Sequence, residues 1–438
     1  MGKYLNFLNK IKLLDIKQIG YSFFYLGVFL LPSALFFSLI FLLISFLINN
    51  LYKKNKPSKD KWNIPFIISG LFMLISTFFH IFVVENFSKG DWDPMLSIIG
   101  LSNWLPFFWI FWCVQPYLKK SIERKRFALI LISGTFPVLI SGIFQYFLNI
   151  TGPFTTLNGL VIWYQRPIED PAGLSSLFNN ANYAGAWLSI VFPFCISSFM
   201  DIKKQKLKKL ITLIICILVG FEMFLTNSRI AWVNLLISIP FVIGSSSFLY
   251  LIPFLILIIL IITWTTNPLF DGFIQDQLRT LIPDKMWMEF SKEGFEGQDI
   301  SRFGIWLNAI EFIIKRPLIG FGAASFPILL QIQSGFWKGH THNLPLEIAI
   351  SYGIPATLII SFTIFLLLFF SGRKIYFSNI QNKFLENYNE KAWWTSILLL
   401  ITSQQVDVHY FDARISICFW ILLGGLRNII SKENYLNA

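Results

Sequence analysis

The distribution of charge along the chain restricts its fold more than any other feature. Apolar runs of about 20 residues, the length that spans a bilayer, alternate with loops that are either rich in Lys and Arg or almost free of them. Only 14% of the 438 residues are charged and 55% are hydrophobic, whereas a soluble domain carries about 25% charged residues. The pattern predicts an all-α integral membrane protein with a single polytopic domain over residues 1–438.

The basic loops predict which side of the membrane each connection faces. Residues 53–61, 119–126 and 203–209 are crowded with Lys and Arg, and the positive-inside rule assigns such loops to the cytoplasm. The loops that connect the other ends of the spans are therefore expected on the outer side. The loops predicted there are 85–95, 149–181 and 267–352.

The first apolar run, residues 21–49, decides the number of spans. Pro32 and Ser33 divide it, and four lysines precede it, which resist export. We therefore expect a hairpin of two short helices and both termini inside; the alternative is one long helix with the N-terminus outside. The twelve predicted spans are 21–31, 34–49, 62–84, 96–118, 127–148, 182–200, 209–226, 230–243, 248–266, 353–371, 392–408 and 412–427.

The net charge of +12 and the four cysteines exclude some classes of partner. The basic residues gather in loops suited to anionic lipid and form no stripe interleaved with aromatics, so membrane lipids and no nucleic acid are expected. The cysteines lie in apolar runs without metal-ligand spacing, which is typical of small hydrophobic side chains. No cofactor is predicted.

The segment 267–352, between spans 9 and 10, is predicted to be the one large outer, periplasmic loop. Residues 303–316 have the periodicity of an amphipathic helix. We expect this helix to lie on the membrane surface or to cap the bundle. Its predicted apolar stripe consists of Ile305, Trp306, Ala309, Ile310 and Ile313.

Two arginines are candidates for binding an anion on this outer face. Arg229 follows the predicted tight turn Asn227-Ser228, at the outer end of a span, where an arginine is costly without a partner. Arg302 follows Ser301, a potential N-cap, and so lies at the positive end of a helix, where a bound anion would explain a cation. The alternatives are an interfacial arginine and an ordinary surface arginine.

His342 is the candidate base. Asn343 can cap a helix that begins at Leu344, so His342 is predicted beside a helix N-terminus, which favours the neutral imidazole. Glu347, one turn further along, is expected to orient His342 or to balance the helix dipole. His340 and His342 could instead form a metal pair, but no further His, Cys or carboxylate cluster in the sequence completes such a site, so no metal is predicted.

Several weaker signals fall on the same face. Arg166 lies among aromatic residues and could bind an anion or stack on a ring. Asn179, Asn180 and Asn182 open a span and could bind substrate or cap the helix. Glu222 lies inside an apolar run and could pair with Arg229. A further polar group, which we interpret as a simple turn between the last two spans, contains Asp407, His409, Tyr410 and Asp412.

Arginines and a histidine base on one face suit transfer from a lipid pyrophosphate donor. The arginines would neutralise the departing diphosphate through charge-assisted hydrogen bonds, in place of a metal ion. His342 would take the proton from an acceptor hydroxyl as the hydroxyl attacks the anomeric carbon of the sugar.

Four stretches, in this order, resemble the O-antigen ligase and polymerase family of bacterial envelope glycan enzymes: SLFNNANYAGAWL, LTNSRIAWV, SRFGIWLNAIEFIIKRPLIGFG and HTHNLPLEIAISYGIPA. The closing stretch VDVHYFDARISICFWILLG is also similar. The resemblance implies an inverting, metal-independent glycosyltransferase of the bacterial inner membrane. It further implies an undecaprenyl-pyrophosphate-linked glycan donor and an active site in the periplasm. The family's essential arginines correspond to Arg229 and Arg302, and its catalytic histidine to His342.

The resemblance leaves the acceptor open. It implies most directly an O-antigen ligase that uses lipid A–core, with a repeat-unit polymerase that extends a growing glycan, or a protein O-oligosaccharyltransferase, as alternatives. A transporter, such as a bicarbonate transporter, is the alternative from another class. It would place polar or broken-helix sites near the bilayer midplane, often in two matching halves, and the sequence shows neither feature clearly.

Overall fold

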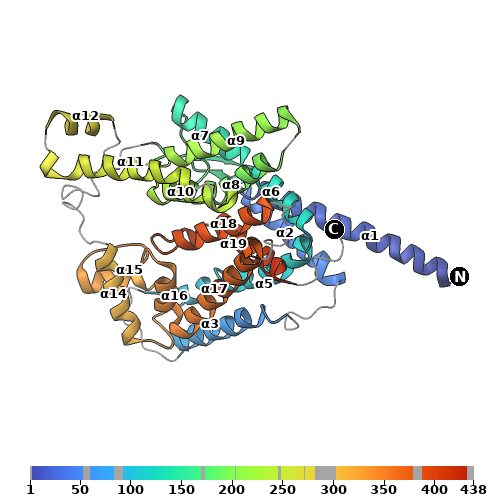
Figure 1. The fold of residues 1–438 in the computed structure, drawn as a ribbon. Coiled ribbons are helices and arrows are strands. Elements are labelled where there is room, and N and C mark those ends of the chain that lie inside the picture. The colour runs from blue at the N-terminus through green and yellow to red at the C-terminus, as the bar shows by residue number, and fades with distance from the viewer. Residues whose placement is uncertain are drawn as a thin grey trace.

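The computed structural model of the protein is a bundle of helices (Figure 1). It describes residues 2–52, 60–82, 92–168, 173–202, 204–244, 248–270, 272–281, 302–377 and 387–431. In the first half of the chain the elements are α1 (Gly2–Leu30), α2 (Leu35–Tyr52), α3 (Ile64–Phe82), α4 (Leu96–Leu101), α5 (Leu105–Val114), η2 (Gln115–Leu118), α6 (Ser121–Gly134), α7 (Phe136–Leu148), β1 (Phe154–Thr156), η3 (Leu157–Gly159), β2 (Val161–Trp163) and α8 (Ala181–Asp201).

The second half of the chain supplies the rest of the bundle and the outer segment. Its elements are α9 (Lys206–Leu225), α10 (Arg229–Ile243), α11 (Phe248–Thr266), η5 (Pro268–Phe270), α12 (Phe273–Leu281), α14 (Arg302–Lys315), α15 (Phe326–Ser334), α16 (Leu344–Tyr352), α17 (Ile354–Phe377), α18 (Tyr388–Ser403), η8 (His409–Phe411) and α19 (Ala413–Ile430).

The predicted break in the first apolar run is present. α1 ends at Leu30 and α2 begins at Leu35, with Pro32 in the turn between them. The two helices pack closely, since Ser38 donates a hydrogen bond across to the carbonyl of Gly27 at 2.7 Å. The helix itself extends back to Gly2, beyond the predicted span start at residue 21, which stays a prediction.

Six helical segments within the described ranges are long and apolar enough to cross a membrane, and two shorter apolar helices are Leu35–Asn50 and Arg229–Ile243. The count of twelve spans stays a prediction. α9, for example, begins with three lysines, which shorten its apolar part. The six long segments are Ile64–Phe82, Leu96–Leu118, Ser121–Leu148, Ala181–Asp201, Ile354–Phe377 and Ala413–Ile430.

Contacts between helix ends show that the chain alternates between two ends of the bundle. At one end Arg124, at the start of α6, forms a buried ion pair with Glu390 at the start of α18, at 2.5 Å. Other polar contacts at this end join the start of α6 to the end of α8, and the end of α19 to residues near the start of α3 and the end of α5. The described parts of the three predicted basic loops adjoin these helix ends. These parts therefore lie at one end of the bundle, in line with the charge pattern.

The opposite end is built from the other ends of the same helices. Asn182, at the start of α8, donates a hydrogen bond to Asp407, which follows α18. The hydroxyl of Tyr410 donates to the carbonyl of Asn103 just before α5. Ser76 near the end of α3 donates to the carbonyl of Ile319 in the outer segment. The predicted outer loops are thus gathered at one end.

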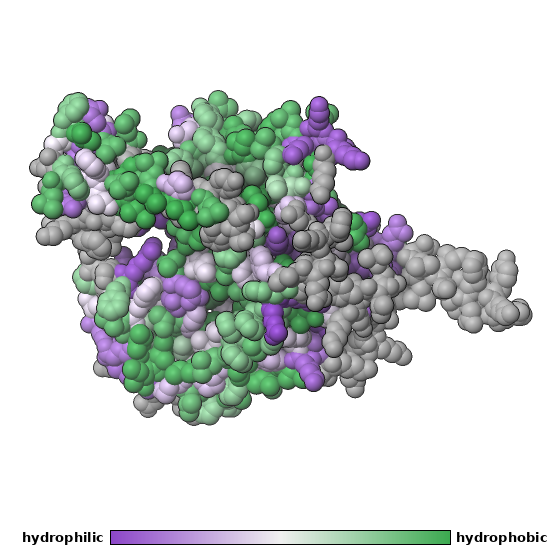
Figure 2. All heavy atoms as spheres, viewed as in Figure 1, coloured by the Kyte–Doolittle hydropathy of each residue, from purple (hydrophilic) through white to green (hydrophobic). Residues whose placement is uncertain are grey.

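Apolar side chains cover much of the face shown in Figure 2. On α9 the exposed apolar residues include Leu210, Ile214, Ile217 and Phe221. Their spacing of three to four residues forms one stripe along the helix, which suits contact with lipid. A similar stripe on α17 consists of Leu358, Phe362, Phe365 and Phe369.

The predicted amphipathic helix in the outer segment is confirmed as α14, one residue from its predicted bounds. Ile305, Ala309 and Ile313 are buried against residues of α15 and α16, in a small core separate from that of the bundle. Ile310 is exposed, contrary to the prediction, and Phe312 is buried instead, because the buried face is centred further round the helix.

Among the residues that the structure describes, one place departs from an all-α fold. Strands β1 and β2 pair antiparallel within the predicted loop 149–181, with Phe154 opposite Trp163. The connecting residues Leu157, Asn158 and Gly159 all have positive φ, the conformation that a tight reversal requires. With three residues each, these strands are too short to show a clear alternating pattern in the sequence.

Candidate functional site

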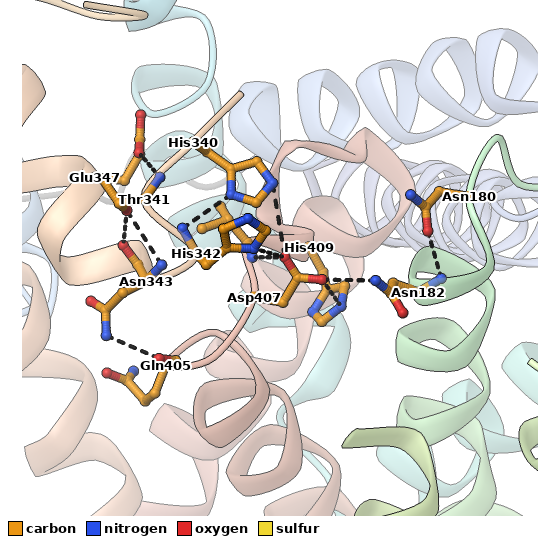
Figure 3. Close-up of polar contacts among 11 residues, drawn as sticks. Asn180, Asn182, His340, Thr341, His342, Asn343, Glu347, Gln405, Asp407 and His409 are labelled. Atoms are coloured by element: carbon orange, nitrogen blue, oxygen red, sulfur yellow. Dashed lines mark hydrogen bonds and ion pairs between the residues drawn. The ribbon is translucent and has the colours of Figure 1, made fainter. Parts of the chain in front are cut away.

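The carboxylate of Asp407 is the centre of the polar cluster at the outer end (Figure 3). Its Oδ1 lies 3.1 Å from Nδ1 of His342 and accepts the backbone N–H of Val408 at 2.9 Å. Its Oδ2 accepts a hydrogen bond from Nδ2 of Asn182 at 3.0 Å and lies 3.4 Å from Nε2 of His409. Three segments distant in sequence therefore meet at one side chain.

The loop that carries His342 is fixed by its own hydrogen bonds. The side chain of Asn343 caps α16 by accepting the N–H of Leu346 at 3.0 Å, as the sequence predicted. Glu347, in the first turn of α16, reaches back and accepts the N–H of Thr341 at 3.0 Å. His342 has a φ of 55°, a left-handed conformation that a β-carbon makes unfavourable. These bonds hold the residue in that conformation.

The same loop is docked on the end of α18. Nδ2 of Asn343 donates to the carbonyl of Gln405 at 3.1 Å, and the N–H of Leu344 donates to the carbonyl of Gln404 at 2.8 Å. Gln404 and Gln405 lie two or three residues before Asp407, so these bonds set the separation of His342 from the carboxylate.

The hydrogen bonds assign the protons on two histidines. Nδ1 of His340 accepts the backbone N–H of His342 at 3.1 Å, so the proton of a neutral His340 is on Nε2, which lies 3.8 Å from Oδ1 of Asp407. An ionised Asp407 can only accept, so Nδ1 of His342 must carry the proton. Nε2 of His342 then has a free lone pair and is available as a base.

Charge and burial support these assignments. Burial alone would raise the pKa of Asp407, but the hydrogen bond from His342 and the surrounding imidazoles of His409 and His340 hold it well below its usual range. Burial and repulsion from His342 lower the pKa of His340 to about 4. Burial likewise lowers the pKa of His409. The cluster therefore contains an ionised Asp407, with His340 and His409 neutral near neutral pH.

The three side chains His340, His342 and Asp407 bring potential ligand atoms within 4.8 Å of one another. The sequence argument that no carboxylate completes a metal site is therefore wrong, because the fold supplies Asp407 from 65 residues away. The protonation pattern does not suit a metal, however. A ligating histidine donates a hydrogen bond from its second ring N–H to a neighbour. Nδ1 of His340 instead accepts a hydrogen bond, which leaves the ring N–H on Nε2, facing Asp407.

Of the two candidate arginines, Arg302 lies near this cluster, and Arg229 lies near Arg302. The charge of Arg302 acts on His340 and His409, and also on Arg229. Asn227 has a φ of 53°, so the predicted tight turn before Arg229 is present. Arg302 is the first residue of α14; Ser301, its predicted cap, lies outside the described residues. Two cations at helix N-termini form a surface suited to an anion.

The other sequence candidates have different surroundings. Arg166 is exposed and lies over the ring of Tyr164, with 5.9 Å from its Cζ to the ring centroid. Asn180 caps α8 by accepting the N–H of Asn182 at 2.7 Å. Asn179 is exposed at the same helix start. Of the three asparagines, the one that reaches the cluster is Asn182.

Glu222 lies apart from the cluster. It is buried against Ser176, whose hydroxyl is 3.5 Å from Oε2, and against Gly142, where a β-carbon would lie 2.6 Å from the carboxyl group. The expected pairing of Glu222 with Arg229 is not what the structure shows. α7 approaches Glu222 closely because residue 142 has no side chain.

The turn between α18 and α19 was interpreted as a simple polar turn, and this interpretation holds for one of its two carboxylates. Asp412 caps α19 and pairs with Arg414, whose guanidinium lies 3.9 Å from the ring centroid of Phe178. Asp407 and His409 instead belong to the site. The sequence offered one hint of this role, since aspartate commonly pairs with histidine. Nothing in the sequence indicated which histidine Asp407 would contact.

One comparison with known proteins found a match. Residues 214–361, about a third of the chain, match the family model described as O-antigen ligase. The matched segment includes Arg229, Arg302 and His342. The resemblance to this family noted in the sequence is thereby confirmed. A search of curated proteins found no match.

The O-antigen ligase segment does not contain the whole cluster. Asp407 and His409 follow it, and Asn182 precedes it. The match favours glycan transfer over transport, and the fold adds the partners of the base from both flanking regions.

Glu347 provides a test of how the loop is held. Burial raises the pKa of Glu347 above its ordinary value of 4.5, although hydrogen bonds from Thr341 oppose this. The folded protein therefore binds this proton more tightly than the unfolded chain, and stability is lost as pH rises from 4.5 through the raised pKa. Glu347→Gln keeps an acceptor for Thr341 and removes the titration, so Tm of the variant should fall less over this range.

The matched control is Glu311→Gln, since Glu311 is an exposed carboxylate paired with Lys315 on α14. Its Tm should keep the pH dependence of the wild type. Glu347→Ala, which leaves the N–H of Thr341 without an acceptor, should lose about 1–3 kcal/mol of stability. Equal pH dependence in Glu347→Gln and wild type would show that Glu347 does not titrate in the folded protein.

Proposed function

We propose that the protein transfers glycan from an undecaprenyl-pyrophosphate-linked donor to an acceptor hydroxyl on the periplasmic face of the bacterial inner membrane. The observation that carries this proposal is the orientation of His342 by Asp407, beside His340 and His409, on which the charge of Arg302 acts. The match of residues 214–361 to the O-antigen ligase family supports it.

The reaction follows from these groups. Nε2 of His342 accepts the proton of the acceptor hydroxyl, whose oxygen forms a bond to the anomeric carbon of the donor sugar. The bond from that carbon to the diphosphate oxygen breaks, and the diphosphate leaves with the electron pair. Attack opposite the leaving group inverts the anomeric centre. Asp407 stabilises the imidazolium that forms, as the carboxylate of a catalytic triad does.

Arg229 and Arg302 bind the diphosphate and neutralise the charge that develops as it leaves. Arg166, Asn179 and Asn180 lie on outer-end loops, where we propose that they line the path of the glycan. Within this scheme the loop of His342 is held by three residues, which act on the substrate indirectly by positioning that loop: His340, Asn343 and Glu347. The positive-inside rule, which assigns the basic loops to the cytoplasm, supports an outer active site.

Among the acceptors, lipid A–core is our first proposal, which makes the protein an O-antigen ligase. The family match supports this choice by its description. A repeat-unit polymerase or a protein O-oligosaccharyltransferase would use the same base and the same arginines with another hydroxyl.

We expect the reaction to need no metal ion, because two guanidinium groups take the role of a divalent cation. Purified protein should therefore retain its transfer activity in excess EDTA. Loss of activity in EDTA, restored by adding back a divalent metal, would contradict this part of the proposal.

His342→Ala should abolish transfer, because it removes the proposed proton acceptor, and the neutral His409 beside it is fully buried. A deletion strain complemented with His342→Ala should show the same surface glycan profile on a gel as the uncomplemented strain, with normal protein level in the membrane. Bare lipid A–core with accumulated lipid-linked polymer would indicate a ligase, and core with one repeat unit a polymerase. A wild-type profile in this strain would refute the mechanism.

Asp407→Asn tests the orientation of the base. An asparagine amide can donate to Nδ1 of His342 and so favour the wrong tautomer, and the comparable change in a serine protease triad lowers kcat about 10⁴-fold. We expect a loss between about 10²-fold and 10⁴-fold in kcat. Asp412→Asn, in the same turn but paired with Arg414, is the matched control and should keep most of the activity. Equal activity of the two variants would remove Asp407 from the mechanism.

A further inference from the structure

Asn182, in the first turn of α8, is the residue from the N-terminal half of the chain that reaches Asp407 (Figure 3). Its Nδ2 donates to Oδ2 of Asp407 at 3.0 Å. Since an ionised carboxylate only accepts hydrogen bonds, the amide nitrogen of Asn182 must be the atom that faces it. This contact lies outside the O-antigen ligase segment.

The second oxygen matters because a carboxyl group rotates easily about its last side-chain bond, where the torsion is broad and two-fold. On Oδ1, Asp407 accepts from His342 and from the N–H of Val408. A donor on Oδ2 as well fixes the plane of the carboxylate, and with it the direction in which Nδ1 of His342 must point. His409 also approaches Oδ2, but both of its ring nitrogens lack a hydrogen bond of acceptable geometry among the described residues.

The donor is itself held on a rigid element. The backbone N–H of Asn182 is bound by the side chain of Asn180, the cap of α8. α8 is the most deeply packed span of the first half of the chain, with Trp187 donating to Thr135 of the α6–α7 junction. Ser396 of α18 donates to the carbonyl of Ile190 in α8 at 2.7 Å. α8 and α18 are thus packed directly against each other, and this packing sets the distance between Asn182 and Asp407.

We propose that Asn182 is a positioning residue for the base: by holding Oδ2 of Asp407, it fixes the orientation of His342. The inference rests on the proposed function, because it concerns the same base. Asn182 acts through Asp407 and does not contact the reacting atoms. Its loss should therefore lower kcat and leave KM unchanged.

The charged and titratable groups around Asp407 determine how pH enters the test. From the loop before α16 these are His340 and His342, and from the α18–α19 turn His409. Arg302 acts from α14 and Tyr183 from α8. A negative charge added at position 182 would join this set beside Asp407 and would favour the protonated form of the base.

The experiment compares Asn182→Ala and Asn182→Asp with wild type in purified full-length protein. The probes are the lipid-linked glycan and the acceptor lipid, both extracted from the deletion strain. Asn182→Ala should lower kcat between about 10-fold and 100-fold, the cost of a hydrogen bond to a charged group. Asn182→Asp should lower it further and move the acidic limb of the kcat–pH profile to higher pH, because the new carboxylate stabilises the imidazolium.

Asn234→Ala is the matched control. Asn234 also donates from a buried amide to the end of α18, to the hydroxyl of Ser403 at 2.9 Å, but it does not touch Asp407. This variant should leave the acidic limb in place. If Asn182→Ala kept the wild-type kcat, or if Asn182→Asp lost activity with an acidic limb identical to that of Asn234→Ala, the positioning role would be wrong.

The outcomes separate the two proposals. The positioning role alone would be overturned if the wild type were active, His342→Ala were inactive and the Asn182 variants were unaffected. Transfer activity that persists in His342→Ala would overturn the proposed function.

Discussion

The bilayer is the constraint on which the rest of the structure depends. A chain that crosses hydrocarbon must satisfy its backbone polar groups internally, so it crosses as helices, and its charges collect at the helix ends or pair when buried. The buried ion pair of Arg124 and Glu390 is an example at the basic end of the bundle. At the other end, the same rule leaves loops as the places where polar chemistry can be assembled. The site is therefore made of helix ends and the residues next to them.

One carboxylate organises that assembly. Asp407 receives hydrogen bonds or close approaches from α8, from the loop before α16 and from its own turn. Each of these segments is fixed independently: α8 by packing, the loop by the Asn343 cap and Glu347, the turn by the end of α18. Because the partners are rigid, the tautomer of His342 follows from the geometry, and the lone pair on Nε2 is set before any substrate binds. Pre-organisation of this kind lowers the cost of reaching the transition state.

The sequence identified the base and the arginines but not the groups that orient the base. His342, Arg229 and Arg302 were found because each adjoins a recognisable helix start. Asp407 was assigned to a polar turn, since a carboxylate in a loop between spans has many ordinary roles. Asn180 and Asn182 look alike in sequence; the first is a cap and the second reaches Asp407. The sequence predicted Ile310 on the buried face of α14, where the structure has Phe312. Periodicity predicts that a helix has an apolar face, but it does not predict which line along that face contacts the neighbouring helices.

By itself, the sequence determined that the protein is a helical membrane bundle, that the chain breaks at Pro32, and which loops share one end. These properties depend on local composition, on hydropathy over about 20 residues and on Pro and Asn at helix boundaries, all of which act over short distances along the chain. The family of residues 214–361 also follows from local motifs. Only the tertiary structure decided that Asn182 and Asp407, 225 residues apart, share a hydrogen bond at His342. That pairing depends on how α8 packs against α18, and no local property of either segment contains it.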